Sequence, residues 1–167
     1  MAFFALDQNF PQPLVQAVAP FIPEVELVPI RNIDVRLADM DDWEILLALH
    51  HHERAWDGLV TTDSSMLNQA RELSVLRQTN GSLVIAHDAG DDPIKATGLL
   101  LAHLAYIAGQ VRATEPQIWR LTANNRPGLN PWEFLERVAQ HQHRAVDDLW
   151  RESRLTRAEL RANPLAA

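Results

Sequence analysis

Short apolar runs recur along the first 125 residues, and each run ends in acidic or turn-forming residues. Buried strands of a parallel sheet have this pattern, because their side chains are covered on both faces. The pattern predicts strands over residues 3–6, 25–30, 59–62, 82–86 and 118–122.

Amphipathic stretches between these runs predict helices. Asp41 and Asp42 provide the cap and the acidic first turn of one helix, which ends before the turn pair Asp57-Gly58. Further helices are expected over 14–20, 66–77 and 94–111. Alternating strands and helices predict an α/β fold, with a parallel sheet of about four or five strands flanked by helices and joined by right-handed crossovers.

The chain beyond residue 125 follows a different pattern. Residues 124–130 are rich in Asn, Pro and Gly and predict a linker, and Asn130-Pro131-Trp132-Glu133 is a typical helix start. An apolar stripe predicts that this helix continues to Trp150, and a short helix is expected near 156–159. We therefore expect an α/β domain over 1–125 and a helical C-terminal extension over 126–167.

Composition and charge narrow the classes of function. The chain contains no cysteine, which excludes disulfides and thiolate chemistry. Its formal net charge is −7, and residues 1–125 hold twice as many acidic as basic residues, so any action on phosphates requires bound cations. There is no glycine-rich phosphate-binding motif. The chain starts without a basic segment, and Asp7 interrupts its first apolar run, which argues against a signal peptide. Together with the lack of a long apolar stretch, this predicts a cytoplasmic protein without a membrane segment.

Acidic residues directly follow the predicted strands at Asp7, Asp63 and Asp88. The carboxyl ends of parallel strands meet at one edge of the sheet, where sites of open α/β folds form, so these acids are expected to converge. Neighbouring carboxylates repel one another, and hard cations such as Mg²⁺ and Mn²⁺ prefer oxygen ligands. Aspartate also favours turns and helix caps for local reasons, and for Asp88 the two interpretations are balanced.

A set of short motifs occurs in order along residues 3–125: Leu6-Asp7-Gln8-Asn9-Phe10-Pro11, Asp42-Trp43-Glu44-Ile45 and Val60-Thr61-Thr62-Asp63. Together they resemble the motifs of PIN-like domains, the fold of VapC-type toxins and related ribonucleases. The resemblance implies a hydrolase, a Mg²⁺- or Mn²⁺-dependent endoribonuclease. It assigns Asp7, Asp42 and Asp63 as catalytic metal ligands, with Asn9 as a supporting polar group.

The chain departs from this family pattern at one acidic position. Relatives often have another Asp two residues after the third acid, where this chain has Ser65. Asp88 or Glu44 would then complete the metal site.

The resemblance also implies partners: an RNA substrate, the antitoxin of a toxin–antitoxin pair and a second copy of the chain as a homodimer. Arg31, Arg36 and Arg120 are candidates for holding phosphates, although surface solubility explains them equally well. The C-terminal extension, with its arginines and tryptophans, is expected to dock an antitoxin, a second subunit or RNA.

Two other functions stay open. One is a catalytically degenerate PIN-like interaction module, in which the aspartates act only as caps and turn residues. The other is a small-molecule phosphatase or a receiver-like regulator, which the lack of a D-x-D-x-T motif disfavours.

Overall fold

A mostly parallel sheet forms the centre of the protein, for which a computed structural model describes residues 1–123 and 128–166. Within the described residues the strand order is β2-β1-β3-β4-β5-β6; β1 to β5 are parallel, and β6 is antiparallel to β5. The strands are β1 (Ala2–Leu6), β2 (Val25–Pro29), β3 (Gly58–Thr61), β4 (Ser82–Ala86), β5 (Gln117–Leu121) and β6 (Gly128–Leu129). The predicted α/β class with a parallel sheet is confirmed.

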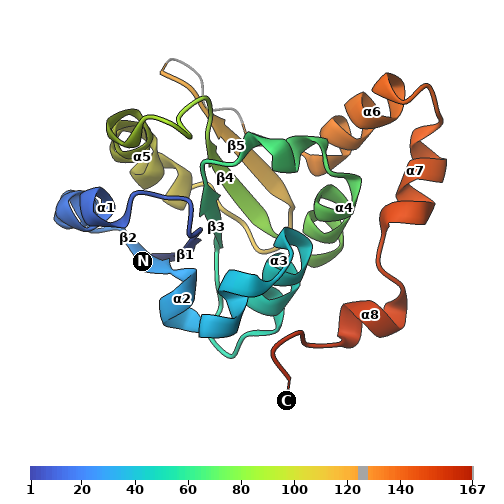
Figure 1. The fold of residues 1–167 in the computed structure, drawn as a ribbon, viewed down its shortest axis with the longest axis horizontal. Helices are drawn as coiled ribbons and strands as arrows, with labels where there is room; N and C mark the ends of the chain where they lie inside the picture. Colours follow the sequence, from blue (N-terminus) through green and yellow to red (C-terminus); the bar gives the residue numbers. More distant parts are fainter. Residues whose placement is uncertain (124–127, 167) are drawn as a thin grey trace.

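Helices cover both faces of this sheet (Figure 1). Helices α1 and α5 form one layer, and α3, α4 and α6 form the other, with α7 and α8 at its outer side. The helices are α1 (Gln12–Val18), α2 (Ile30–Ile33), α3 (Asp42–His51), α4 (Ala70–Thr79), α5 (Pro93–Ala108), α6 (Pro131–His141), α7 (Val146–Ser153) and α8 (Arg157–Arg161). Across the described residues, no helix has the length and apolar character needed to cross a membrane.

Side chains along each strand alternate between the two helical layers, as the period of two in a strand requires. Ala5, Leu59 and Ile85 are buried in the core beneath α3, α4 and α6. Phe4 and Val60 are buried in the core beneath α1 and α5. A residue two positions after Ala5, Leu59 or Ile85 points to the same side of the sheet. It therefore lies on the α3–α4 side even where the strand has already ended.

The C-terminal extension is divided into α6, α7 and α8, so the prediction of one helix up to Trp150 is wrong. Helix α6 ends at His141, and His143 has a left-handed backbone with φ 54°, which interrupts a right-handed helix. The turn reverses the chain, so that the rings of Trp132 and Trp150 meet with their centroids 6.0 Å apart.

Strand β6 lies inside the segment that was predicted to be a linker, of which residues 124–127 fall outside the described part of the chain. Its register places Gly128 opposite Trp119 of β5. A Cβ atom on Gly128 would lie 2.9 Å from the Trp119 ring. Glycine therefore lets the strand pass close over the indole, a tertiary contact that composition does not reveal.

Residues 30–39 contain α2 and the 3₁₀ helix η2 (Val35–Asp39), so the predicted strand over 25–30 ends at Pro29. Asp34 caps η2 by accepting a hydrogen bond from the backbone N–H of Arg36 at 2.9 Å. Leu37 is fully buried beneath this segment and holds it against the core.

Helices α6 and α7 share the core of the α3–α4 layer. Leu135 and Leu149 are buried in one cluster with Leu73 and Leu76 of α4. The extension therefore covers apolar surface of the sheet domain as well as its own.

Replacing Leu135 by Ala tests how firmly α6 is held. Leu135 is 0% exposed, so we expect the free energy of unfolding to fall by about 2–5 kcal/mol in a single transition followed by urea titration. Leu101→Ala, on the outer surface of α5 and 45% exposed, serves as the matched control and should change stability by about 0.5 kcal/mol or less. Equal, small losses in both variants would mean that α6 docks only loosely.

Candidate functional site

The ends of β1 and β3 bring the first and third predicted acids to the same edge of the sheet. The two strands pair in parallel with Leu6 opposite Val60, and the backbone N–H of Asp7 donates to the carbonyl oxygen of Val60 at 2.9 Å. Asp63 leaves β3 two residues after its last residue, Thr61. The carboxyl edge of the sheet therefore carries both side chains.

Asp7 is a buried carboxylate held by hydrogen bonds, and it is only 5% exposed. Its Oδ2 accepts from Thr61 Oγ1 at 2.7 Å and from Asn9 Nδ2 at 3.4 Å, and its Oδ1 accepts from the backbone N–H of Gln8 at 2.7 Å. Burial raises the pKa of Asp7 and the charge of Asp63 raises it further, against the lowering effect of these hydrogen bonds. Asn9 thus lies where a supporting group was expected.

Asp42 is the first residue of α3, and it joins the same group of charges. Burial raises the pKa of Asp42, and the charges of Asp7 and Asp63 raise it further. The neighbouring Asp41 adds a smaller effect in the same direction. Acids from separate elements are therefore close enough to repel one another, while the positive end of the α3 dipole offsets part of that repulsion.

Glu72, in the first turn of α4, is a further acid that sequence reasoning missed. It is only 8% exposed, and burial raises its pKa, with added effects from the charges of Asp42 and Asp41. With its amide nitrogen assigned toward this carboxylate, Gln69 lies 3.0 and 3.2 Å from the two oxygens. In the sequence, Glu72 could be recognised only as an acidic residue in the first turn of the helix that follows the motif ending in Asp63. The favourable interaction of acidic residues with a helix N-terminus explains this position equally well.

These carboxylates stand apart from one another. Within residues 1–123 and 128–166, no group of three or more His, Asp and Glu side chains could hold a metal ion as it stands. The donor set suits a hard divalent cation by its chemistry, since it offers carboxylate oxygens, but it would have to close around the ion.

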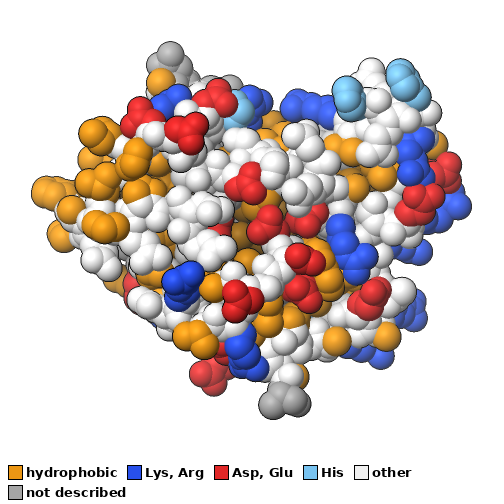
Figure 2. All heavy atoms as spheres, in the orientation of Figure 1, with side chains coloured by type: hydrophobic (Ala, Val, Ile, Leu, Met, Phe, Trp, Pro, Cys, Tyr) orange, Lys and Arg blue, Asp and Glu red, His pale blue; other side chains and the backbone are white. Residues whose placement is uncertain are grey.

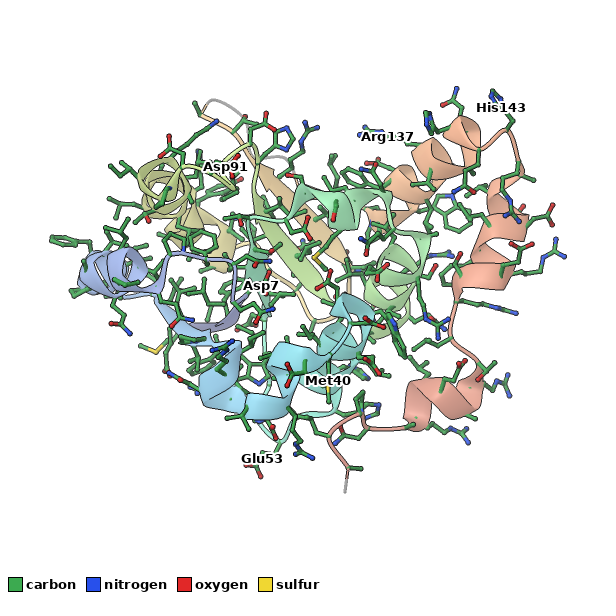
Figure 3. The ribbon with its side chains drawn as sticks, in the orientation of Figure 1. Asp7, Met40, Glu53, Asp91, Arg137 and His143 are labelled. Carbon is green, nitrogen blue, oxygen red and sulfur yellow. The ribbon has the colours of Figure 1, made fainter. Side chains whose placement is uncertain are left out.

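The acids gather near the middle of one face of the molecule. Figure 2 shows acidic side chains around a depression there, with basic side chains along the rim over the C-terminal helices. Figure 3 places Asp7 in the same central region, near the end of β1. A ligand approaching this face therefore meets negative charge at its centre.

Two of the predicted supporting residues have local structural partners. Glu44 Oε2 accepts a hydrogen bond from the backbone N–H of Asp41 at 3.0 Å, as part of the capping box of α3. Ser65 is exposed, and its backbone N–H donates to Asp63 Oδ1 at 2.8 Å. Glu44 is thus committed to the helix cap, and Ser65 orients Asp63 through its backbone.

His87 follows β4 and connects this edge to β5. Its Nε2 lies 2.6 Å from Arg120 Nη2, and its Nδ1 lies 3.2 Å from Ser64 Oγ. His87 Nε2 thus lies between a guanidinium, which can only donate, and the Asp88 carboxylate, which can only accept. Arg120 therefore places a positive charge beside His87, the residue that follows β4.

Asp88 lies away from the acids that shift one another's pKa. Its side chain is 74% exposed, with Oδ2 3.1 Å from His87 Nε2, and its backbone has φ 52°. It does not contribute to the pKa shifts of Asp7 or Asp42. These features are typical of a turn residue.

Arg36, one of the arginines considered for phosphate binding, has a structural partner. Its Nε and Nη2 donate to the two carboxylate oxygens of Asp34 at 3.0 and 2.6 Å, and its Nη1 donates to the carbonyl oxygen of Leu165 at 3.0 Å. The hydrogen bonds from Arg36 lower the pKa of Asp34 to about 2. Arg31, by contrast, is exposed.

A pocket of about 270 Å³ lies at the opposite, amino edge of the sheet. Trp56, Gly58, Gly81 and Arg112 are among its lining residues, and the predicted acids are not. The candidate site is therefore the acidic depression at the carboxyl edge, and this pocket is separate from it.

Comparison with known proteins gives no relative for this chain. No protein-family model, curated protein or solved structure matches it. The function is therefore inferred from the residues of the site.

Replacing Asp42 by Asn removes one of the repelling charges. The pKa of Asp42 in the folded protein lies above its usual value of 3.8, so its ionisation destabilises the fold. That penalty is absent below pH 3.8 and grows as pH rises through the folded pKa. We expect Asp42→Asn to raise the Tm at pH 7 by about 2–4 °C, with the gain shrinking as the pH falls to 3.8.

Thermal unfolding followed by circular dichroism in EDTA, from pH 3.8 upward, measures this effect. Asp91→Asn, in the exposed loop before α5, removes the same charge elsewhere. The same gain in both variants, or a gain independent of pH, would contradict the repulsion.

Proposed function

We propose that this protein is a divalent-metal-dependent endoribonuclease of the PIN-like type. The observation that carries the proposal is the charge repulsion within the acidic site, where Asp63 raises the pKa of Asp7 and both raise the pKa of Asp42. Such a cluster destabilises the fold, and functional sites are where strongly perturbed carboxylates concentrate. The positions of these acids are those that the PIN-like motifs assign to metal ligands.

Asp7, Asp42 and Asp63 would hold Mg²⁺ or Mn²⁺, and Glu72 supports the proposal as the fourth acid of the group. A bound divalent cation supplies neutralisation of phosphodiester charge and a water of lowered pKa. The protein's own contribution is orientation: Thr61 fixes Asp7, and the backbone N–H of Ser65 fixes Asp63. Both carboxylates keep further lone pairs for a cation.

Arg120 is the residue we assign to a phosphate of the RNA at this edge. A guanidinium pairs well with phosphate oxygens, and the charge of Arg120 lies next to His87 on the acidic side of the sheet. His87 orients this guanidinium, and Ser64 in turn orients His87. The RNA substrate implies the cytoplasm as the place of action, and an antitoxin and a homodimer belong to the same proposal through the family resemblance.

A catalytically inactive interaction module is the second candidate. It is favoured by the open spacing of the acids within the described residues and by the local role of Asp63, which caps η3 (Ser64–Asn68). In this case Asp7 and Asp42 would be ordinary strand-end and helix-start residues. Metal binding and RNA cleavage separate the two candidates.

RNA cleavage tests the proposed activity directly. We expect the protein to cleave a labelled RNA with Mn²⁺ or Mg²⁺ but not with EDTA. Asp63→Asn should lower the rate at least about a hundredfold, because even residues that only orient metal ligands contribute 10–100-fold. Asp91→Asn is the matched control and should cleave like the parent protein. Cleavage that persists in EDTA or in Asp63→Asn would indicate a different activity or a contaminating nuclease.

Metal binding has a separate measurement that needs no substrate. Mn²⁺ at about a hundred times its Kd should raise the Tm by about 5–10 °C, because binding to the folded state alone stabilises it by about 2.7 kcal/mol. Asp42→Asn should lose most of this shift, and Asp91→Asn should retain it. A shift of equal size in both variants would place the ion elsewhere.

A further inference from the structure

A groove of about 480 Å³ runs between α4, α7 and α8, away from the acidic depression. Three arginines line it, together with polar and apolar side chains: Gln78, Arg151, Arg154, Leu155, Thr156, Arg157 and Leu160. Among the described residues that line it, none is acidic. The groove is therefore a concave cationic surface on a protein of net charge −7.

The walls of the groove are fixed by hydrogen bonds. Gln78 Nε2 donates to the carbonyl oxygen of Leu155 at 3.0 Å, and the backbone N–H of Leu155 donates to Gln78 Oε1 at 2.9 Å. Leu155 is only 3% exposed, and Thr156 forms a capping box with Glu159 at the start of α8. The segment that carries Arg154 and Arg157 is thus held on α4 before any ligand binds, which lowers the entropy lost on binding.

The arginines at the middle of the groove are available for a ligand. Arg154 and Arg157 are exposed, and neither has an acidic partner within the part of the chain that the structure describes. Arg151 is shared with Asp148 through a hydrogen bond of 2.9 Å. Figure 2 shows basic side chains along this rim of the molecule.

One acid of α7 and one of α8 have their own partners. Glu152 pairs with Arg144 at 2.7 Å, and Glu159 accepts from Arg71 at 3.4 Å. Their charges are therefore largely offset before a ligand arrives, and the groove remains positive.

Two aromatic side chains pack on Arg77, the residue that precedes Gln78 in α4. The guanidinium carbon of Arg77, next to Gln78 in α4, lies 4.3 Å from the Trp132 ring centroid and 4.5 Å from that of Trp150. Both indoles are partly exposed. Arginine interleaved with aromatic rings beside a cationic groove is the arrangement that binds single-stranded nucleic acid, through stacking and backbone contacts.

We infer that the groove between α4, α7 and α8 binds the phosphate backbone of single-stranded RNA through Arg151, Arg154 and Arg157. The choice of RNA rests on the proposed function, because the acidic site repels a polyanion and affinity must come from a cationic surface elsewhere. Helix α4 connects the two places, with Glu72 in its first turn and Gln78 near its end. Six residues of helix span about 9 Å, so one RNA strand can contact both.

Fluorescence anisotropy of a labelled single-stranded RNA tests this binding at low salt. EDTA is present, so that the metal-dependent cleavage does not occur during the measurement. We expect Arg157→Glu to weaken binding at least about fivefold and to reduce the slope of log K against log salt by about 0.7 for each lost phosphate contact. Arg112→Glu, an equal charge change at the exposed amino edge of the sheet, should bind within about twofold of the parent protein.

Arg157→Gln adds no new acid and should weaken binding less than Arg157→Glu but in the same direction, which keeps the test valid if the charge reversal fails to fold. An equal loss of RNA affinity in the Arg112 and Arg157 variants would overturn RNA binding in the groove, since the change in net charge alone would then explain the loss. Tighter binding of poly-glutamate than of RNA would overturn RNA as the occupant in favour of an acidic protein segment. RNA binding that depends on Arg157, in a parent protein that does not cleave RNA with Mn²⁺, would support the groove while refuting the nuclease.

Discussion

The parallel pairing of β1 with β3 is the constraint on which the site depends. It fixes Asp7 against Val60 by a backbone hydrogen bond of 2.9 Å, and Asp63 follows three residues later. Because a parallel pair ends at one edge, two carboxylates separated by more than fifty residues must share a small region. The helices that follow β2 and β3 then begin at that edge and bring Asp42 and Glu72 to it.

The gathered charges oppose folding, and the surrounding structure offsets this effect. Burial and mutual repulsion raise the pKa of Asp7, Asp42 and Glu72. The hydroxyl of Thr61 and the backbone N–H of Gln8 stabilise the charged form of Asp7. The N-termini of α3 and α4 add positive dipole ends. A cation would relieve the rest of the repulsion, which is why the proposed metal site and the stability of the fold are linked.

Acidic side chains gather near the centre of one face of the molecule, whereas basic and acidic side chains are mixed over the C-terminal helices (Figure 2). The acidic depression lies at the carboxyl edge of the sheet, and the arginine groove lies on the C-terminal helices at its rim. Helix α4 belongs to both, since Glu72 and Gln78 lie near its two ends. The C-terminal helices therefore cover the core beneath α4 and also carry the arginines of the groove.

The sequence alone determined the α/β class, the strands that end in Asp7 and Asp63 and the helix that begins at Asp42. These features depend on local rules: apolar runs form buried strands, and acids open helices. The burial of Glu72, the pairing of Arg120 with His87 and the exposure of Asp88 depend on contacts between elements distant in the chain. Tertiary packing likewise decided the break at His143, the strand at Gly128 and the groove on α4. The turn and the contacts that fix these features produce no periodic pattern of residues in the sequence.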